Sequence, residues 1–291
     1  MTTAATHRDR ARAEAGPAGL GPLRLARPAG RVYPRRAPAE LAGVELRFMT
    51  DFLGSFGARP DHELYARGGG NGFIAMAGAL LDGLERPLPE LDHLLLAYHV
   101  PDMNVVEVAG CFLAGRCPGA PEVFSVSGQG VGAAFTALRV LQGLRLSGRT
   151  GHGAVLALDQ STLPYPDPDI VAGRDRDCAV LLHTAPAGAP DTVEVDFLTE
   201  RDVADPNAAL EELALARPEA AVIVGRMLAD RLDPRLRGRA TFTEGPPDQL
   251  CTSAWSALAE HWRSDRYTVV ADYDPYSGRL FQAGLRPGAS P

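Results

Sequence analysis

Residues 124–148 read FSVSGQGVGAAFTALRVLQGLRLSG, in which a short apolar strand, a glycine-rich turn and an amphipathic helix follow one another. A sharp turn of this kind can present a nucleophile at a helix start, where free N–H groups and the helix dipole favour an anion. The turn offers Ser127, Gln129, Gly130 and Val131. Among these four, Ser127 has the only hydroxyl, and the simplest role for it is to bond the backbone at the strand end.

Other candidates lie elsewhere in the chain. Cys251 opens a helix predicted over residues 250–262, and the helix start favours a thiolate there. The neighbouring Asp248 opposes that thiolate by like charge. His99 follows an apolar run and could face a pocket. The candidate catalytic residues are therefore Ser127, Cys251 and Asp248, and the candidate substrate-binding residues are His99, Gln129, Gly130 and Val131.

Cysteine and lysine usage limits the chemistry further. The four cysteines form no Cys-x-x-Cys pair, and no histidine lies beside them at metal-ligand spacing. We therefore expect reduced thiols and no metal site. All 29 basic residues are arginine, which excludes a Schiff-base lysine and a phosphate-binding P-loop. We expect no cofactor.

The charge is distributed unevenly along the chain. Residues 1–37 carry eight arginines and two acids, although the net charge of the chain is −7. This segment is rich in Ala, Pro and Gly and has no period, so we predict a flexible extension, and we expect residues 1–30 to contribute little to stability. The acidic remainder disfavours a nucleic-acid partner. Because the sequence has neither an export signal nor a run of about 20 apolar residues, we expect a cytoplasmic protein without a membrane partner.

The rest of the chain alternates between predicted helices and buried strands. We predict two halves, residues 38–184 and residues 185–291, with mixed and largely parallel sheets covered by helices. The long helices predicted over residues 131–148 and 250–262 each follow a turn and precede a strand, which suggests similar topology in both halves. Further helices are predicted at residues 71–85, 104–116 and 209–216, and strands at residues 91–100, 122–127, 153–159, 177–184, 192–200, 219–226, 238–244, 267–274 and 279–287.

This order resembles the thiolase-like superfamily, and most closely the ketoacyl synthase III-like condensing enzymes. PEVFSVSGQGVGAAFTALRVLQGLRLSGRTGHGAVLALDQS resembles their nucleophile segment, GRDRDCAVLL resembles their glycine-rich turn and strand, and AAVIVGRMLADRL with GPPDQLCTSAWSAL resembles the segments that carry a catalytic His and Asn. The match covers roughly residues 65–288. It implies a five-layered α/β/α/β/α fold.

The resemblance also implies a catalytic Cys, His and Asn, and all three residue types differ here. The Cys position falls at Gly130 or Val131, the His position near Gly225 or Arg226, and the Asn position near Asp248. Such enzymes hold the acyl group as a thioester on the Cys, and neither Gly130 nor Val131 has a side chain that can form one.

Three functions therefore stay open. The first is a catalytically degenerate ketosynthase-like subunit that shapes or scaffolds an acyl-condensing enzyme of polyketide, fatty-acyl or other secondary-metabolite synthesis. The resemblance implies that such a subunit would form a homodimer, or a heterodimer with an active ketosynthase, through residues 122–127. The second is an acyltransferase that acts on acyl-CoA or acyl-carrier protein with a relocated nucleophile, Ser127 or Cys251. The third is a small-molecule binder that keeps the acyl pocket.

Overall fold

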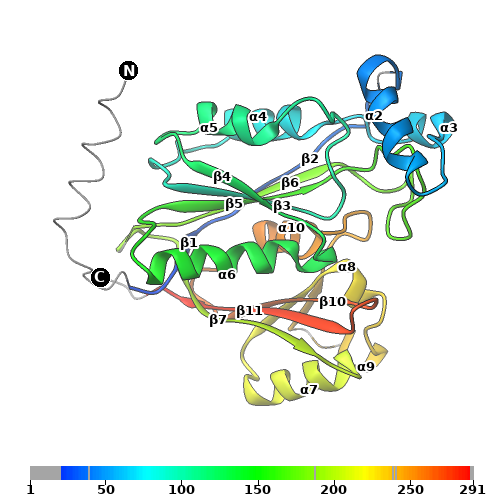
Figure 1. The fold of residues 1–291 in the computed structure, drawn as a ribbon. Helices are drawn as coiled ribbons and strands as arrows, with labels where there is room; N and C mark the ends of the chain where they lie inside the picture. Colours follow the sequence, from blue (N-terminus) through cyan, green and yellow to red (C-terminus); the bar gives the residue numbers. More distant parts are fainter. Residues whose placement is uncertain (1–20, 39, 187, 238, 240, 289–291) are drawn as a thin grey trace.

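The computed structural model describes residues 21–38, 40–186, 188–237, 239 and 241–288 (Figure 1). Its strands form two sheets. Sheet A has the order β1-β7-β11-β10-β8-β9, and sheet B has the order β2-β6-β5-β3-β4. The strands of sheet A are β1 (Arg24–Ala26), β7 (Thr192–Asp202), β8 (Ala221–Val224), β9 (Phe242–Glu244), β10 (Thr268–Asp274) and β11 (Arg279–Pro287). Those of sheet B are β2 (Ala29–Val32), β3 (His93–Tyr98), β4 (Glu122–Val126), β5 (Gly153–Asp159) and β6 (Cys178–His183).

The same strand pattern occurs in both sheets. In sheet B, β3 pairs parallel with β4 and β5, and β5 pairs antiparallel with β6. In sheet A, β8 pairs parallel with β9 and β10, and β10 pairs antiparallel with β11. The two halves therefore share one topology, as predicted. The sheets are mixed, but the expectation that they are largely parallel is wrong, because five of the nine pairings among the described strands are antiparallel.

Helices form layers outside and between the sheets (Figure 1). α6 and α10 lie between the sheets, α4 and α5 cover the outer face of sheet B, and α7 and α9 cover the outer face of sheet A. The five-layered prediction is confirmed. The helices are α2 (Gly43–Gly54), α3 (His62–Ala66), α4 (Phe73–Asp82), α5 (Ala109–Arg116), α6 (Ala133–Leu146), α7 (Pro206–Ala216), α8 (Arg226–Ala229), α9 (Pro234–Arg237) and α10 (Ser253–Glu260), and a 3₁₀ turn, η1 (Gly130–Gly132), precedes α6.

The central layer is packed by aromatic rings from both halves. Phe135 of α6 lies 4.7 Å from Trp255 of α10 and 5.9 Å from Phe281 of β11, measured between ring centroids. All three side chains are almost completely buried. Ring pairs at these distances stabilise a core beyond the area that they bury. The contact therefore joins the two central helices to sheet A.

The N-terminal segment corrects the prediction of a flexible extension over residues 1–37. β1 pairs with β7 in sheet A, and β2 pairs with β6 in sheet B. Leu23 and Leu25 are completely buried in the central core. Strands of three and four residues have too few positions to show a period, so sequence patterns could not predict them. The part of the prediction that concerns residues 1–20 lies outside the described residues.

The triple glycine at residues 68–70 allows close packing near the end of β5. A Cβ atom on Gly69 would overlap the carboxylate of Asp177. That carboxylate accepts hydrogen bonds from the backbone and side chain of Asn71 and of Ser161. The glycines therefore bring this loop onto a buried carboxylate just before α4.

Two helices before this loop, α2 of 12 residues and α3 of five, were not predicted. α2 and α3 enclose a small separate core with Met49, Tyr65 and Met103.

In the described part of the chain no helix combines the length and the apolar character needed to cross a bilayer.

Candidate functional site

The start of α6 is closed by side chains from sheet A. Val131 in η1 is 3% exposed. A Cβ on Gly132 would overlap the ring of Phe281, and a Cβ on Gly130 would lie 3.6 Å from the carboxylate of Asp274. Gly130 also has a φ of +50°, which disfavours other residues. A side chain at this turn therefore meets an aromatic ring or a carboxylate.

Ser127 and Gln129 lie at the other side of this turn. Ser127 is exposed just beyond the end of β4, and Gln129 is half-buried. β4 is an edge strand of sheet B. Ser127 is therefore accessible to solvent and to a partner chain.

The structure brings Cys251 to the start of α6. Cys251 is 2% exposed and shares the central core with Val131. Its Sγ lies 3.9 Å from the carbonyl oxygen of Ala97. Burial raises the pKa of this thiol well above its usual value, and the charge of Asp159 adds to the rise, although the backbone N–H of Ala134 opposes it. Cys251 is therefore a protonated thiol at neutral pH.

Asp159, which the sequence did not single out, organises the turn before α10. Its carboxylate accepts hydrogen bonds from the backbone N–H groups of Leu250, Cys251 and Thr252 and from the Thr252 hydroxyl at 2.6–2.9 Å. Complete burial raises the pKa of this carboxyl despite these bonds. Asp159 ends β5 in one half and fixes a helix start in the other half. An acid directly after a buried apolar run was the only signal for it in the sequence.

A buried ion pair follows β8. Arg226 donates from Nη1 to Asp175 Oδ2 at 3.0 Å and from Nη2 to the carbonyl oxygen of Asp169 at 3.0 Å. A Cβ on the preceding Gly225 would overlap the carboxylate of Asp272. Burial raises the pKa of Asp272 to about 7. Residue 226 therefore belongs to a buried charged network, and residue 225 has no room for a side chain.

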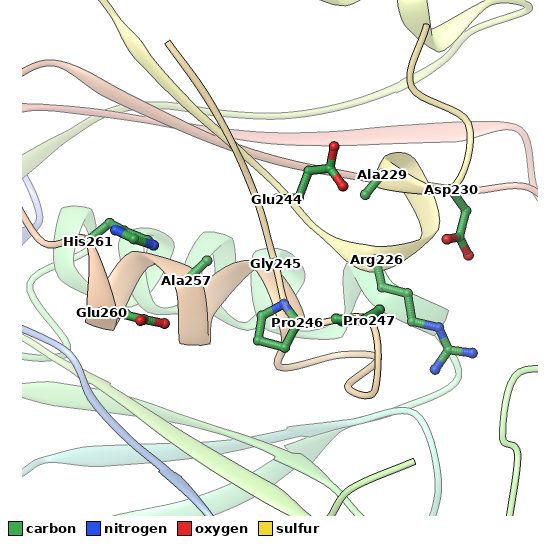
Figure 2. Close-up of a pocket in the computed structure, with 10 residues that line it drawn as sticks. All are labelled: Arg226, Ala229, Asp230, Glu244, Gly245, Pro246, Pro247, Ala257, Glu260 and His261. Atoms are coloured by element: carbon green, nitrogen blue, oxygen red, sulfur yellow. The ribbon is translucent and has the colours of Figure 1, made fainter. Parts of the chain in front are cut away.

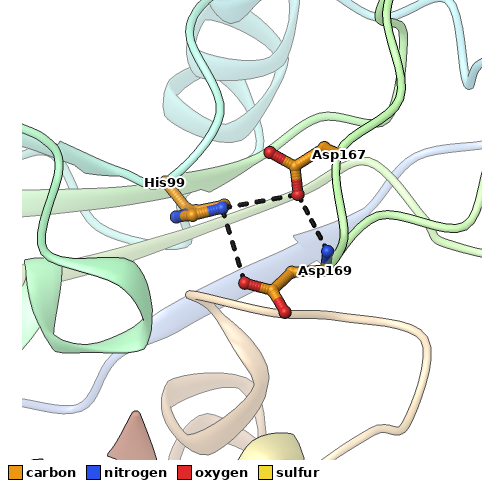
Figure 3. A group of neighbouring side chains, drawn as sticks. All are labelled: His99, Asp167 and Asp169. Atoms are coloured by element: carbon orange, nitrogen blue, oxygen red, sulfur yellow. Dashed lines mark hydrogen bonds and ion pairs between the residues drawn. The ribbon is translucent and has the colours of Figure 1, made fainter. Parts of the chain in front are cut away.

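His99 lies in a second polar cluster (Figure 3). Its Nε2 is 3.6 Å from Asp167 Oδ1 and 3.8 Å from Asp169 Oδ2. Burial lowers the pKa of His99, but the two carboxylates outweigh burial and raise it above its usual value. The hydroxyl of Tyr276, from the β10–β11 turn, donates to Asp169 Oδ1 at 3.0 Å. Sequence reasoning found His99 and missed its partners, which lie in the acid- and proline-rich segment 164–169.

Asp248 lies apart from these groups in the loop before α10. Its side chain is half-buried, and its carbonyl oxygen accepts the backbone N–H of Arg176 at 2.8 Å. Of the predicted site residues, the structure therefore unites Val131 with Cys251 in the core. Ser127 lies on the exposed edge, and His99 belongs to the polar cluster.

A separate open pocket of about 310 Å³ lies between α8, β9 and the end of α10 (Figure 2). None of the predicted site residues lines it. Its lining is Arg226, Ala229, Asp230, Glu244, Gly245, Pro246, Pro247, Ala257, Glu260 and His261. The Arg226 guanidinium is already bound to Asp175, and Glu244 is paired with Arg237 at 2.6 Å.

Known structures match this fold over nearly the whole chain. The tetronic acid condensing enzyme AbyA1 is 14% identical, with 91% of this chain and 99% of that chain covered and a TM-score of 0.60. A 3-oxoacyl-(acyl-carrier-protein) synthase III is 14% identical, with 91% and 100% covered and a TM-score of 0.56. OleA from Xanthomonas campestris is 13% identical, with 92% and 98% covered and a TM-score of 0.58. The protein has the thiolase-like fold of the ketoacyl synthase III-like condensing enzymes.

No family model and no curated protein sequence matches the chain. Its thiolase-like fold is therefore established by structure, at an identity of 13 to 15% to its neighbours. These neighbours are condensing enzymes and an acyltransferase. Within this fold, the position that the resemblance gives to the catalytic Cys holds Gly130 and Val131, and the position that it gives to the His holds Gly225 and the paired Arg226.

Proposed function

We propose that the protein is a non-condensing, ketosynthase-like subunit that scaffolds an acyl-condensing enzyme or shapes its acyl pocket. The observation that carries this proposal is the start of α6, where Gly130 and Val131 offer no group that can accept an acyl chain and where the ring of Phe281 packs against Gly132. Covalent catalysis needs an accessible nucleophile with a base beside it.

A restored cysteine would also meet an unfavourable environment. At Gly130 it would adopt a positive φ and face the Asp274 carboxylate. A like charge raises the pKa of a thiol and so disfavours the thiolate. The backbone and the charge at this turn therefore disfavour a thiolate, which supports a subunit that makes no thioester.

The edge of sheet B supports a role in assembly. β4 leaves one side of its backbone without a partner strand among the described residues. Phe124 on this strand is 37% exposed, and Val108 and Val140 on the neighbouring segments are also exposed. Proteins usually protect an apolar edge, because it can pair with another chain. We propose that β4 pairs with a second copy of this chain or with a ketosynthase that retains the Cys, His and Asn.

The alternative is an acyltransferase with a relocated nucleophile. Cys251 suits this role poorly, because its thiol is buried and its pKa is raised. Ser127 is the stronger candidate, because it is exposed beside the edge strand. Its substrate would be an acyl-CoA or an acyl-carrier protein. The two functions differ in one readout, which is a covalent adduct.

The decisive experiment combines intact mass and oligomeric state. We expect wild-type protein incubated with acetyl-CoA or malonyl-CoA to show no added mass, because no accessible nucleophile occupies the start of α6. An adduct that maps to Ser127 and is lost in Ser127→Ala would replace the proposal with the acyltransferase.

The interface is tested separately by Val126→Asp, measured by analytical ultracentrifugation alone and after co-expression with a ketosynthase that retains its catalytic residues. We expect the charge to dissociate the oligomer, because it would be buried in a strand pair. The matched control is Leu215→Asp, at a position on α7 that is 79% exposed and far from β4 in the fold. Equal masses for wild type and both variants would contradict an interface at β4.

A further inference from the structure

His99, Asp167 and Asp169 bring three potential metal ligands close together. One ligand atom from each residue lies within 4.8 Å of the other two. The separations of 3.6 and 3.8 Å from His99 Nε2 are too long for good hydrogen bonds. Ligands at about 2.0–2.2 Å from one metal ion lie roughly 3–4 Å from each other. The two distances from His99 Nε2 therefore suit a shared cation better than direct hydrogen bonds, and the two carboxylate oxygens lie within 4.8 Å of each other.

Neighbouring groups hold these ligands in place. The backbone N–H of Asp169 donates to Asp167 Oδ1 at 2.9 Å. Tyr276 donates to Asp169 Oδ1, which leaves Asp169 Oδ2 directed toward His99. The guanidinium of Arg226 holds the carbonyl oxygen of Asp169 at 3.0 Å. Ligating carboxylates in metal sites are usually fixed by hydrogen bonds of this kind.

The histidine presents one nitrogen to the cluster. Its Nδ1 is buried and has no partner among the described residues. Nε2 points toward both carboxylates (Figure 3). The His99 and Asp167 side chains are about one-fifth exposed, so an ion can enter from solvent.

We propose that His99, Asp167 and Asp169 bind one divalent transition-metal ion. One imidazole nitrogen with two carboxylate oxygens suits Zn²⁺ or Mn²⁺ better than Ca²⁺, which prefers six to eight oxygen ligands. Three protein ligands leave at least one coordination position for water. The ion would fix the loop after β5 to the end of β3, and through Tyr276 and Arg226 it would join both halves of the chain. This proposal does not depend on the proposed function.

The test uses the full chain after treatment with EDTA and titration with ZnCl₂, MnCl₂ or CaCl₂ alone. We expect Zn²⁺ or Mn²⁺ to bind at one equivalent per chain by calorimetry. A ligand that binds only the folded state also stabilises it, so we expect the melting temperature to rise by about 3 °C or more at saturation. We expect Ca²⁺ to have a much smaller effect.

Two variants assign the site. His99→Gln and Asp167→Asn each remove one ligand with little change in volume, and we expect at least about tenfold weaker binding in both. The matched control is His183→Gln, which changes a histidine of β6 in the same half; it should bind as the wild type does. Binding that is equal in all four proteins, or absent from the wild type, would overturn the proposal.

If a variant fails to fold, Co²⁺ absorption of the wild type provides the second measurement. A saturable visible band at one equivalent, displaced by Zn²⁺, supports the site. A titration without such a band overturns it.

Discussion

Asp159 and Asp274 occupy equivalent places in the two halves, since each ends the strand that follows a central helix, β5 after α6 and β10 after α10. Each also lies near the start of the opposite central helix. Asp159 accepts four hydrogen bonds from the turn before α10. Asp274 lies beside Gly130 before α6, but it accepts hydrogen bonds from Tyr276 and Ser277 of its own turn.

Asp159 therefore makes a structural contact with the opposite helix start, whereas Asp274 makes no hydrogen bond to the turn before α6 among the described residues. At α10 a buried carboxylate satisfies backbone donors that would otherwise be buried without partners. At α6 no side chain of the described residues caps the helix start, and apolar packing closes it. The start of α10 is therefore bound to the end of β5 in the other half through Asp159. The other helix start, at α6, is closed by the buried Val131 and by the ring of Phe281 against Gly132.

The largest expected effect is that of Asp159→Ala. The substitution leaves three buried N–H groups without an acceptor, and each such group costs about 1–3 kcal/mol. We expect a loss of about 5 kcal/mol in the free energy of unfolding, measured by urea denaturation. Asp274→Ala is the matched control, because the Asp274 carboxylate accepts hydrogen bonds only from its own half-exposed turn. This variant should lose about 1 kcal/mol in the free energy of unfolding. Equal losses in both variants would show that the two positions do not differ.

The next effect concerns Asp272, the carboxylate beside Gly225. It ionises at 3.8 when unperturbed, and burial raises its pKa to about 7. The folded state therefore binds more protons than the unfolded state between these values, and the stability falls as the pH rises from 4 to 7. The contribution is up to about 4 kcal/mol.

Asp272→Asn should remove this part of the pH dependence, measured as the free energy of unfolding at pH 4.5 and pH 8. The expectation fails if the variant and the wild type lose the same stability over this range.

A smaller effect is expected at the sealed helix start. Gly132→Ala places a methyl group against the ring of Phe281. Overpacking of this kind costs about 1–3 kcal/mol, which thermal unfolding can detect. Gly143→Ala on the same helix meets no atom within 4 Å, so it should be neutral or stabilising by up to about 1 kcal/mol. A neutral Gly132→Ala would show that the start of α6 has free space.

Val131→Cys should have the smallest effect on stability. It also tests directly whether the start of α6 is closed to a substrate. The change should cost less than about 1.5 kcal/mol, because both side chains are small and apolar. We expect no adduct after incubation with acetyl-CoA, because position 131 is buried. In unfolded protein a thiol reagent should label one more cysteine in the variant than the four of the wild type, which serves as the control. An acylated native variant would mean that only the nucleophile has been lost.

The sequence predicted most of the fold because its buried strands are continuous apolar runs. β3, β5 and β6 lie within one to two residues of the predicted strands. β1 and β2 could not be predicted, because their few residues lie among arginines and prolines and are held by pairing with distant strands. Tertiary contacts decide such short elements.

The site was predicted in a similar, partial way. The strand, turn and helix around Gly130 were visible because local patterns define them. The clustering of His99 with Asp167 and Asp169 was not, because the fold brings these segments together from distant parts of the chain. Asp159 and Arg226 were missed as buried partners for the same reason.

The pairing of β1 and β2 with opposite sheets has a consequence for biosynthesis. β1 is made well before its partner residues in β7, which are Thr192–Glu194. Contacts this distant in sequence slow folding, because a long loop must close before they form. Until β7 has been made, β1 has no strand to pair with, and Leu25, which is buried in the folded chain, is not yet covered by sheet A. The pairing of β1 with β7 is thus a contact that forms late, although all five strands of sheet B lie before residue 184.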